Sequence, residues 1–581
     1  MSRIAVVDNE RLKDMSLKKY IQSLCPVNRA GTECIQIEDG LLTIDELTCI
    51  GCGICIKAAT DAIKIVNLPE ILTKSPIHRY GENAFALFSL PTPLFRKVVG
   101  IIGVNGIGKS SAVSILSGFL KPNLGKLGEQ ASYDDLIAFF KGTEVQSYFE
   151  KMKKKDIIVS YKPQHVQYIP KQFKGTVRQL LEKVDEKKQL QEIVKMLDIN
   201  AILDSDITNI SGGELQRVAI AACVLKKAHL YIFDEPTSYL DIKQRMLVSH
   251  FIKELANEQT AVIVIEHDLI ILDFISDVAQ IMFGSADVYG SISQPKPAKN
   301  AINTYLSGFL KEENIRFREK EIKFTQKKPF VKRKEIPLVA WSEITKKMDT
   351  FSLHAKAGAI NQSEVIGVLG ENGIGKTTFV KMLAKEMKPD TGDIDEKVTV
   401  SYKPQYIEGS EELVMAYLKD AMSKYTNQLI NPLDIKPLLL KKLNELSGGE
   451  LQRVAIAHCL GKEAQLYLLD EPSAYLDVEQ RLNVSKVIRD YMEMKASSAL
   501  IVDHDLLFLD YLSDKIMVFE GIPAKEGFVR GPFLLEEGMN LFLKNIQITL
   551  RRDKDTMMPR INKPGSVLDR EQISQGKYYY G

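Results

Sequence analysis

Two short glycine-rich segments have the residue types and spacing that bind a triphosphate. GVNGIGKS runs from Gly103 to Ser110, and GENGIGKT runs from Gly370 to Thr377. In a G-x4-G-K-[ST] loop the backbone N–H groups and the positive end of the following helix face the phosphates, while the lysine reaches the outer ones. We therefore predict phosphate contacts from the two loop lysines and Mg²⁺ contacts from the two loop hydroxyls.

Each loop is followed, much further along the chain, by an acidic pair that ends an apolar run. The first run, YIFDEP, contains Asp234 and Glu235, and the second, YLLDEP, contains Asp470 and Glu471. An aspartate at the end of a buried strand belongs on the other side of the Mg²⁺ ion from the loop hydroxyl. Each half of the chain is therefore expected to hold one nucleotide with its metal.

The motifs form two copies of one series. The phosphate loop, YKPQ, SGGELQRVAIA, the Asp-Glu-Pro run, YLD and a His-Asp pair follow one another in the same order twice. Each loop also follows an apolar run, VVGII or EVIGVL, which reads as the buried strand that such a loop requires. The repeat predicts two tandem α/β domains.

This combination of motifs resembles the ATP-binding-cassette superfamily, and the match covers both copies. In that family two nucleotide-binding domains meet head to tail, so the resemblance implies that each site is completed by the other copy. Ser447 and Gly449 would face Lys109, and the corresponding serine and glycine of the first copy would face Lys376. ATP binding would draw the lobes together and hydrolysis would release them, so the product is movement.

The resemblance also assigns the site residues. The predicted catalytic residues, which polarise the attacking water or contact the γ-phosphate, are Glu235, Glu471, His267 and His504. The predicted ATP and Mg²⁺ ligands are Gly103, Asn105, Gly106, Gly108, Lys109, Ser110, Ser111, Gln164, Asp234, Gly370, Asn372, Gly373, Gly375, Lys376, Thr377, Thr378, Gln405 and Asp470. The predicted signature and D-loop residues are Ser211, Gly212, Gly213, Glu214, Asp241, Ser447, Gly448, Gly449, Glu450 and Asp477. Because both copies keep every motif residue, we expect two hydrolytic sites. Aromatic residues that could stack on adenine, or could simply be core, are Tyr80, Phe85 and Phe351.

The first copy contains an insertion. Its loop lysine and its YKPQ glutamine are 55 positions apart, against 29 in the second copy. Most of the excess lies at about 130–156, where Ser132 with Asp135 and Thr143 with Gln146 have capping-box spacing. We predict a helix–loop–helix that is either a surface decoration or a docking element. Its apolar faces and the lysines at 151, 153, 154 and 155 would suit a partner that carries phosphates.

A second kind of chemistry is indicated near the N-terminus. Cys49, Cys52 and Cys55 keep the C-x2-C-x2-C spacing of a bacterial ferredoxin, but Ala59 stands where a fourth cysteine is expected. In two-cluster ferredoxins the fourth cysteine of a motif precedes proline and ligates the other cluster, and Cys25 is such a residue. These four cysteines could hold one [4Fe–4S] cluster. Four thiolates could also bind zinc, and the site could be empty.

A ferredoxin-like region ahead of twin cassettes resembles the ribosome-recycling ATPases of archaea and eukaryotes, the ABC class E or RNase L inhibitor family. HRYGENAF, NIRFRE and the final RRDKDTMMPRINKPGSVLDREQISQGKYYY also look like segments of that family. The resemblance covers nearly the whole chain, including the insertion. It implies an ATP hydrolase that splits ribosomes into subunits after termination or stalling. The implied partners are the small subunit with its rRNA, a termination or rescue factor, and initiation factors.

The chain departs from that family at one cluster. The family's first motif reads C-x4-C-x3-C-x3-C-P, and counting back from the cysteine before proline places Ile21, Leu17 and Leu12 at the other positions. With Ala59, all four ligands of one cluster are replaced while all four of the other remain. We infer one cluster kept and one replaced by apolar packing. The remaining cysteines, expected to be buried structural thiols, are Cys34, Cys223 and Cys459.

Composition bounds the remaining choices. The 581 residues carry 77 Lys+Arg against 75 Asp+Glu, a net charge of +2 that identifies no partner by itself. The longest apolar runs are strand-length, the N-terminus has no apolar signal region, and the cysteines avoid disulfide-like pairing. We expect a cytoplasmic protein with no membrane contact, active as a monomer whose two cassettes form an intramolecular dimer.

The expected class is α/β, with a small α+β ferredoxin-like domain in front. The predicted domains are the iron–sulfur domain 1–75, the first nucleotide-binding domain 76–300, a hinge 301–340, the second nucleotide-binding domain 341–535 and a C-terminal hinge segment 536–581. The linker of residues 311–335 interleaves basic residues with Phe317, Phe324 and Phe330. It is either only solvated or, as the resemblance implies, an rRNA contact shared with Arg551, Arg552, Arg560 and Lys563.

Two other functions compete with ribosome recycling. The chain could be the detached motor subunit of a membrane importer, against which the ferredoxin region and the insertion argue. It could also be an iron–sulfur electron-transfer ATPase, although the sequence shows no flavin motif or second electron centre.

Overall fold

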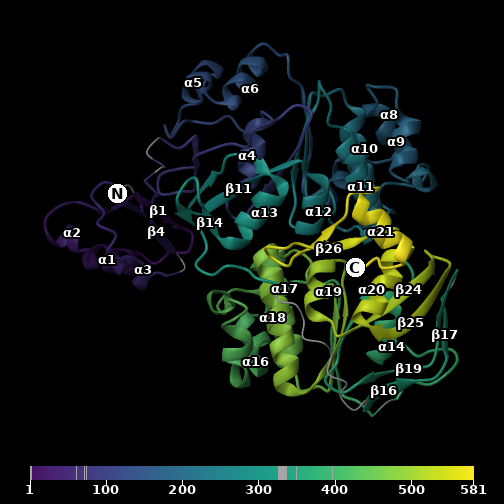
Figure 1. Cartoon of the computed structure of the whole chain (residues 1–581). Helices are drawn as coiled ribbons and strands as arrows, with labels where there is room; N and C mark the ends of the chain where they lie inside the picture. Colours follow the sequence, from purple (N-terminus) through teal and green to yellow (C-terminus); the bar gives the residue numbers. More distant parts are fainter. Residues whose placement is uncertain are drawn as a thin grey trace. The chain divides into compact units, whose positions relative to one another are not determined.

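The computed structural model describes residues 3–60, 62–70, 72, 75–324, 336–348, 350–395 and 397–580 (Figure 1). The chain forms two compact units. The first contains Met1–Ser238, Val248–Glu266 and Ile275–Ile322, and the second contains Tyr239–Leu247, His267–Phe274 and Lys323–Gly581. Within the described residues, no helix is long and apolar enough to cross a membrane.

The N-terminal part of the first unit is a small α+β fold. Two antiparallel pairs join β1 (Arg3–Val7) to β4 (Ile63–Asn67) and β2 (Ile35–Glu38) to β3 (Leu41–Ile44). Its helices are α1 (Met15–Leu24), α2 (Pro26–Arg29) and α3 (Ile54–Ala58). These elements share one apolar core that includes four of the buried cysteines.

The rest of the first unit is built on a nine-stranded sheet whose main path runs β5-β6-β12-β11-β7-β10-β9-β8. Its parallel part comprises β8 (Val159–Lys162), β9 (Leu230–Asp234), β10 (Ala261–Ile265), β7 (Val98–Ile102) and β11 (Val278–Ser285). At its edge are β12 (Tyr289–Ile292), β6 (Ala86–Leu87), β5 (His78–Arg79) and, paired with β11, β13 (Lys296–Pro297). The helices named below are α4 (Lys109–Leu116), α10 (Gly212–Leu225) and α13 (Ala298–Ser307).

The second unit repeats this sheet. Its eight strands run β17-β18-β25-β24-β20-β23-β22-β21. Their bounds are Ile344–Met348, Phe351–Ala355, Glu526–Leu534, Lys515–Ile522, Val365–Leu369, Ser498–Val502, Leu466–Asp470 and Val400–Lys403. The main helices are α14 (Lys376–Leu383), α17 (Gly448–Gly461), α18 (Val478–Lys495), α19 (Leu506–Leu512) and α20 (Leu535–Asn545). The two sheets confirm the predicted α/β class.

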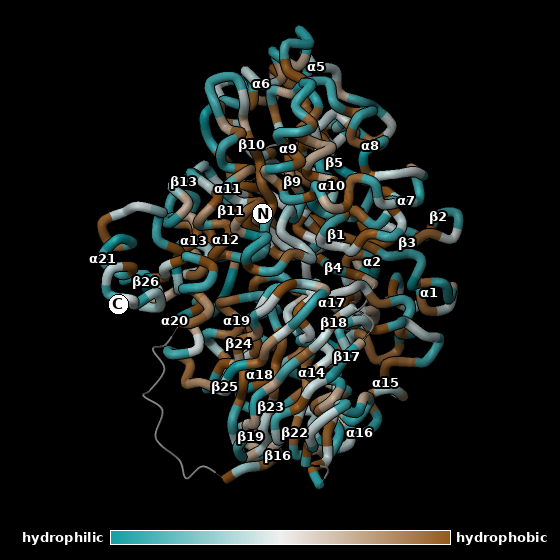
Figure 2. The backbone as a smooth tube through the Cα atoms, turned by 90° about the vertical axis from the view of Figure 1, so that its right-hand side faces the viewer, coloured by the Kyte–Doolittle hydropathy of each residue, from teal (hydrophilic) through white to brown (hydrophobic). Residues whose placement is uncertain are grey.

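The central strands form because their sequences are apolar on both faces. VVGII, LYIFD and AVIVI in the first sheet, and VIGVL, LYLLD and SALIV in the second, are buried at every position. Figure 2 shows hydrophobic residues concentrated along these strands. Strands of this kind require helices on both faces of a parallel sheet, which leaves the carboxyl ends of the strands to carry polar residues.

The insertion is a helix–loop–helix, as predicted, with α5 (Tyr133–Phe139) and α6 (Glu144–Lys153). The predicted capping box at Ser132 is present. The one predicted at Thr143 is absent, because its hydroxyl donates to the carbonyl of Phe140 at 2.8 Å instead of accepting from the helix.

The apolar faces of the insertion are not free for a partner. Phe140 and Phe149 stack with ring centroids 5.5 Å apart, and both belong to the same apolar core as the cassette. The hydroxyl of Tyr148 donates to the carbonyl of Leu116 on α4. These aromatic residues therefore attach the insertion to the cassette, and whether it is a decoration or a docking element stays a prediction. The surface that remains is basic: the lysines at 151, 153, 154 and 155 are exposed, although Lys153 pairs with Asp134 at 2.6 Å.

The predicted basic rRNA contacts require a correction. Arg560 is 1% exposed and is held by Asp553 and Asp273. Its charge is therefore neutralised inside the protein. Arg551 donates to the carbonyl of Ile561 at 3.0 Å.

Two further members of the predicted basic surface differ from Arg560. Arg552 lies 4.1 Å above the Tyr580 ring, whereas Lys563 is exposed. Of the linker phenylalanines, Phe317 stacks on Tyr305 and Phe324 is buried, while Phe330 lies outside the described residues.

Candidate functional site

Each phosphate loop joins a buried strand to a helix: β7 leads to α4, and β20 leads to α14. Gly108 and Gly375, which precede these helices, have φ angles of 93° and 89°, in the left-handed region where glycine has no steric penalty. A Cβ at Gly108 would lie 2.6 Å from the Phe85 ring, and one at Gly375 would lie 2.9 Å from the Phe351 ring. Both the backbone conformation and the aromatic neighbour therefore require glycine.

The two phenylalanines occupy equivalent places in the two cassettes. Tyr80, the third aromatic residue proposed for adenine, is more than half exposed and its hydroxyl lies 2.8 Å from the Oγ of Ser111. It has a different environment from the phenylalanine pair. Adenine stacking by Phe85, Phe351 or Tyr80 stays a prediction.

The loop lysines turn back onto their own loops. Lys109 Nζ donates to the carbonyl of Gly103 at 2.8 Å, and Lys376 Nζ donates to the carbonyl of Gly370 at 2.7 Å. Both lysines are buried, and burial lowers the pKa of Lys376 to about 8. A phosphate at this position would give the ammonium group a charged partner, which binds more strongly than neutral carbonyls.

Asp234 and Asp470, the Walker-B aspartates, end β9 and β22 and are buried. In the second site Thr377 Oγ1 donates to Asp470 Oδ2 at 2.9 Å, so two of the predicted Mg²⁺ ligands are adjacent. In the first site Asp234 Oδ2 accepts from the Tyr161 hydroxyl at 3.2 Å. Burial raises the pKa of both aspartates, and a bound Mg²⁺ would counter this effect by favouring the ionised form.

The predicted catalytic glutamates are held by the predicted glutamines. Gln164 Nε2 donates to Glu235 Oε1 at 2.6 Å, and Gln405 Nε2 donates to Glu471 Oε1 at 2.8 Å. Burial, and then the charge of the preceding aspartate, raises the pKa of both glutamates. A carboxylate with a raised pKa is better matched to accepting a proton from water near neutral pH.

The backbone of both glutamates is strained. Glu235 and Glu471 have φ angles of 47° and 48°, which are uncommon for residues other than glycine. Such conformations persist only where surrounding contacts enforce them. The contacts that do so here were not predicted from the sequence.

One of these contacts comes from the lysine of each YKPQ motif. Lys162 Nζ donates to the carbonyl of Asp234 at 2.8 Å, and Lys403 Nζ donates to the carbonyl of Asp470 at 2.8 Å. Burial lowers the pKa of each lysine to about 8. The signal was present in the sequence, because this lysine recurs beside the glutamine that was identified in both copies.

The other contact comes from the glutamine of each SGGELQR motif. Gln216 Nε2 donates to the carbonyl of Glu235 at 2.6 Å, and Gln452 Nε2 donates to the carbonyl of Glu471 at 2.6 Å. Both glutamines are buried on the helix that follows the signature serine. The signature helix is thus hydrogen-bonded to the predicted catalytic glutamate of its own cassette.

His504 lies between two of the predicted site residues. Its Nε2 is 3.4 Å from Lys376 Nζ and 3.7 Å from Glu471 Oε1. Burial, assisted by the lysine charge, holds the pKa of His504 well below its usual value, so its ring is neutral at physiological pH. His267 belongs to the second unit and its predicted site to the first, so its contact with a γ-phosphate stays a prediction.

The signature serines start the helices α10 and α17. The Oγ atoms of Ser211 and Ser447 accept from the N–H groups of Glu214 and Glu450 at 3.3 Å, and each glutamate accepts in return from the serine N–H at 2.8 Å. The signature glycines therefore lie in the first turn of a 14-residue helix, where N–H groups and the helix dipole favour an anion. Their apposition to the other cassette stays a prediction.

The two predicted D-loop aspartates make ordered contacts in the second unit, which includes residues 239–247. Asp241 Oδ2 accepts from the backbone N–H of Asn372 at 2.9 Å. Asp477 caps α18 by accepting from the N–H of Gln480 at 2.9 Å. Asp241 is therefore placed beside a residue of the phosphate loop at Gly370–Thr377.

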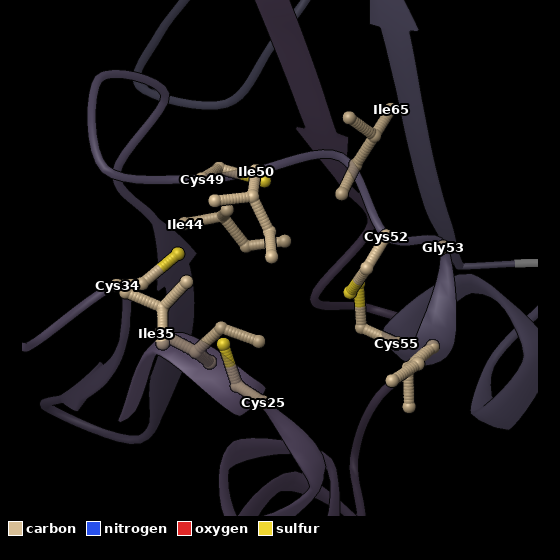
Figure 3. A pocket seen from close by; sticks show the side chains of 12 residues that line it. Cys25, Cys34, Ile35, Ile44, Cys49, Ile50, Cys52, Gly53, Cys55 and Ile65 are labelled. Carbon is tan, nitrogen blue, oxygen red and sulfur yellow. The ribbon is translucent and has the colours of Figure 1, made fainter. Parts of the chain in front are cut away.

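The N-terminal cysteines surround one pocket. Cys25, Cys49, Cys52 and Cys55 line it together with Cys34, which the sequence had set apart as a structural thiol (Figure 3). The N–H of Gly51 donates to Cys49 Sγ at 3.4 Å. Over the described ranges, no three or more His, Cys, Asp or Glu side chains are placed to hold a single metal ion.

The residues at the four absent ligand positions are apolar and lie in the same core. Leu12 and Ile21 are 2% and 0% exposed members of that core, and Leu17 and Ala59 pack against the core as partly buried residues. Apolar side chains therefore occupy the positions at which the family's cysteines would ligate a second cluster.

The cassette motifs are shared with a large family of known proteins. The family model described as "ABC transporter" matches residues 96–238 and 353–474. This match implies ATP and Mg²⁺ as ligands and ATP hydrolysis as the activity, on residues that include both phosphate loops and both Walker-B aspartates.

Full-length relatives extend the match to the whole chain. An uncharacterised ABC transporter ATP-binding protein of Methanocaldococcus jannaschii is 48% identical, over 100% of this chain and 97% of its own length. ABC transporter E family member 1 of Arabidopsis thaliana is 41% identical, over 100% and 99%. Translation initiation factor RLI1 of Saccharomyces cerevisiae is 40% identical, over 100% and 98%.

Solved structures agree. Archaeal ABCE1, in a structure described as a model of ribosome-bound archaeal Pelota and ABCE1, superposes with a TM-score of 0.94 at 49% identity, covering 100% of this chain and 99% of that one. The archaeal ribosome recycling factor aABCE1, in a complex with the ribosomal stalk protein aP1, gives a TM-score of 0.83 at 51% identity, covering 87% and 99%. With its twin cassettes, its cysteine pocket and matches over its full length, the chain belongs to the ABC class E family, the RNase L inhibitor family.

Proposed function

We propose that this protein is an ATP-driven ribosome recycling factor, which splits ribosomes into subunits after termination or stalling and then stays on the small subunit. The observation that carries this proposal is the full-length match to ABCE1 in a ribosome-bound structure with Pelota. A second structure contains a family member with a ribosomal stalk protein, which supports the ribosome as partner. The relatives do not favour a membrane importer, because the matches cover the ferredoxin-like region as well as the cassettes.

The geometry supports hydrolysis at both sites. In each cassette a partly buried glutamine donates to the glutamate that would take a proton from the attacking water, and a buried lysine lies at the loop that would bind the phosphates. Ser110 and Asp234 would hold Mg²⁺ in one site, and Thr377 and Asp470 would hold it in the other. We assign the same roles to both sites because the glutamine–glutamate and lysine–loop contacts recur in both.

Closure of the two cassettes would couple these sites. In the proposed arrangement the signature helix of each cassette closes over the phosphates of the other, with Ser447 and Gly449 completing the site of Lys109. The rigid link from Gln216 and Gln452 to the catalytic segments supports this coupling. A helix that moved on contact with the opposite nucleotide would also move its own catalytic glutamate.

The cysteine pocket is the proposed site of one [4Fe–4S] cluster. Cys25, Cys49, Cys52 and Cys55 line one pocket whose other walls are mostly apolar, a setting that fits four thiolate ligands. A bound cluster would make the N-terminal domain of the first unit rigid and would have no role in electron transfer. Zinc is the competing occupant, since four thiolates also suit it. Metal and acid-labile sulfide analysis separates the two, with about four irons per chain expected for one cluster.

We place this activity in the cytoplasm and assign it to a monomer whose cassettes pair within the chain. The proposed domain limits are 1–75, 76–300, 301–340, 341–535 and 536–581. Release or rescue factors, and initiation factors, are the proposed further partners.

The test traps the protein with a non-hydrolysable ATP analogue and sediments it with purified ribosomal subunits. We expect it in the small-subunit fraction at low salt, and release as salt is raised. The variant that combines E235Q and E471Q should lose turnover by about 100-fold or more, because glutamine cannot accept a proton. Unchanged turnover and splitting in that double variant, or absence from the small-subunit fraction, would refute the proposal.

A further inference from the structure

The cluster pocket contains one cysteine more than a [4Fe–4S] cluster needs. Cys34 is 1% exposed and lines the same pocket as the four predicted ligands. Its thiol contacts that of Cys25 and is close enough to Cys49 for an electrostatic interaction. Figure 3 shows Cys25 and Cys34 on one side of the pocket, with Cys52 and Cys55 on the opposite side.

Backbone and side-chain hydrogen bonds fix Cys34 relative to Cys25. Asn28, on the helix that Cys25 precedes, accepts from the N–H groups of Cys34 and Ile35 at 3.2 and 2.9 Å. The Asn28 amide also donates to the carbonyl of Ile35 at 2.8 Å. The two cysteines are thus held as neighbours by contacts that do not involve either thiol.

The thiol of Cys34 makes only a long contact with the backbone around it. Its Sγ lies 3.9 Å from the carbonyl of Asp45, a long contact even for sulfur. Of the eleven other residues that line the pocket, five are isoleucine, and the polar side chains that interact with the Cys34 thiol are Thr48 and Cys25. Buried cysteines of this kind pack as small apolar groups unless a metal recruits them.

We propose that Cys34 is an alternative fourth ligand of the cluster, able to take the iron position that Cys25 would otherwise hold. This inference rests on the proposed cluster. Cys49, Cys52 and Cys55 supply three thiolates from one loop, and the fourth must come from the side where Cys25 and Cys34 are neighbours. Ligation by Cys34 releases its proton to solvent and involves no change in oxidation state.

The test measures bound iron and sulfide, and the visible absorbance of the cluster, in the purified full-length chain. The variants are C25S, C34S and C25S/C34S, with C223S as a buried-cysteine control outside the pocket. We expect C25S and C34S each to keep more than about half of the wild-type iron, because one fourth ligand remains in each. The double variant should retain only a three-ligand cluster with less iron, visible as a new electron paramagnetic resonance signal.

The outcomes separate this inference from the proposal on which it rests. Wild-type protein without iron and sulfide would refute the cluster itself. If the wild type holds a cluster but C25S loses as much iron as the double variant, Cys34 is not a ligand and the inference is wrong. If C34S alone loses as much iron as the double variant, the inference is also wrong, because Cys34 would then be an indispensable ligand rather than an alternative one. Unchanged thermal unfolding of the variants would show that a loss of iron is not a loss of fold.

Discussion

At the scale of single residues, the predicted catalytic glutamates depend on partners that have no chemical role in the proposed mechanism. Glu235 and Glu471 adopt left-handed backbone conformations, and Gln216 and Gln452 bind their carbonyl oxygens at 2.6 Å. These glutamines touch neither substrate nor metal in the proposed mechanism, so they act as positioning residues. Their removal should change turnover more than nucleotide affinity.

We therefore predict that Q452A lowers kcat by about tenfold or more with little change in KM, because the lost hydrogen bond is worth about 1–3 kcal/mol when its acceptor stays buried. Q452E keeps the shape but places an oxygen against the carbonyl of Glu471, so its kcat should fall at least as far. Steady-state ATPase kinetics over a range of ATP concentrations check both variants. Equal kcat in wild type and Q452E would show that this hydrogen bond does not position the glutamate.

Arg560 was predicted from the sequence to contact rRNA, but the structure gives it a different role. It is buried between Asp553 and Asp273, so R560M should leave two carboxylates without their cation, a change that typically costs about 3–5 kcal/mol. R551M is the matched control, because Arg551 is only partly buried and binds carbonyl and amide oxygens. Thermal unfolding should show a clearly lower midpoint for R560M than for R551M. Similar midpoints for the two variants would contradict a structural role for Arg560.

At the scale of elements, the helices, strands and loops that depend only on neighbouring residues were predicted correctly from the sequence. Apolar runs such as AVIVI predicted buried strands, and the strand–loop–helix context predicted the phosphate loops, because both depend on neighbouring residues only. The helix–loop–helix was predicted for the same reason. Its packing was not, since Phe149, besides stacking on Phe140, belongs to the core of the cassette, and the hydroxyl of Tyr148 donates to Leu116.

The candidate site divides in the same way. The Lys, Asp, Glu and Gln of each motif were identified because their spacing is characteristic, whereas Cys34 was set aside because its spacing is not. Its place in the pocket follows from Asn28, which joins α2, the helix after Cys25, to the start of β2 by hydrogen bonds. Side-chain hydrogen bonds of this kind leave no mark in the spacing of the cysteines.

The insertion offers a direct test of local encoding. S132A removes a complete capping box and should destabilise α5 by about 1 kcal/mol. T143A should cost less at the start of α6, because no side-chain cap exists there. Hydrogen exchange of the helix amides measures each helix separately, which a global unfolding curve of so large a chain does not. The ranking would be contradicted if T143A increased the exchange rate of α6 over its wild-type rate by more than S132A increases that of α5.

At the scale of the whole molecule, the near-zero net charge hides a local asymmetry. The chain carries a net +2, yet the end of the insertion exposes several lysines in five residues, of which Lys153 already pairs with an aspartate. Three aromatic residues of this element, Phe140, Tyr148 and Phe149, are buried in the cassette core and do not reach its surface. A phosphate-bearing partner would therefore bind here electrostatically and would release counterions as it binds.

If Lys154 and Lys155 bind rRNA phosphates, K154A/K155A should weaken binding to the small subunit and reduce the slope of log affinity against log salt by about 1 for each lysine–phosphate pair removed. The matched control is K419A/K436A, which removes two exposed lysines from the second cassette and the same total charge. Binding is measured at several salt concentrations with the non-hydrolysable ATP analogue present. A loss of affinity with the slope unchanged would mean that the lysines act through the fold of α6 rather than through phosphates. Equal changes in the control would mean that net charge, and not this surface, governs the encounter.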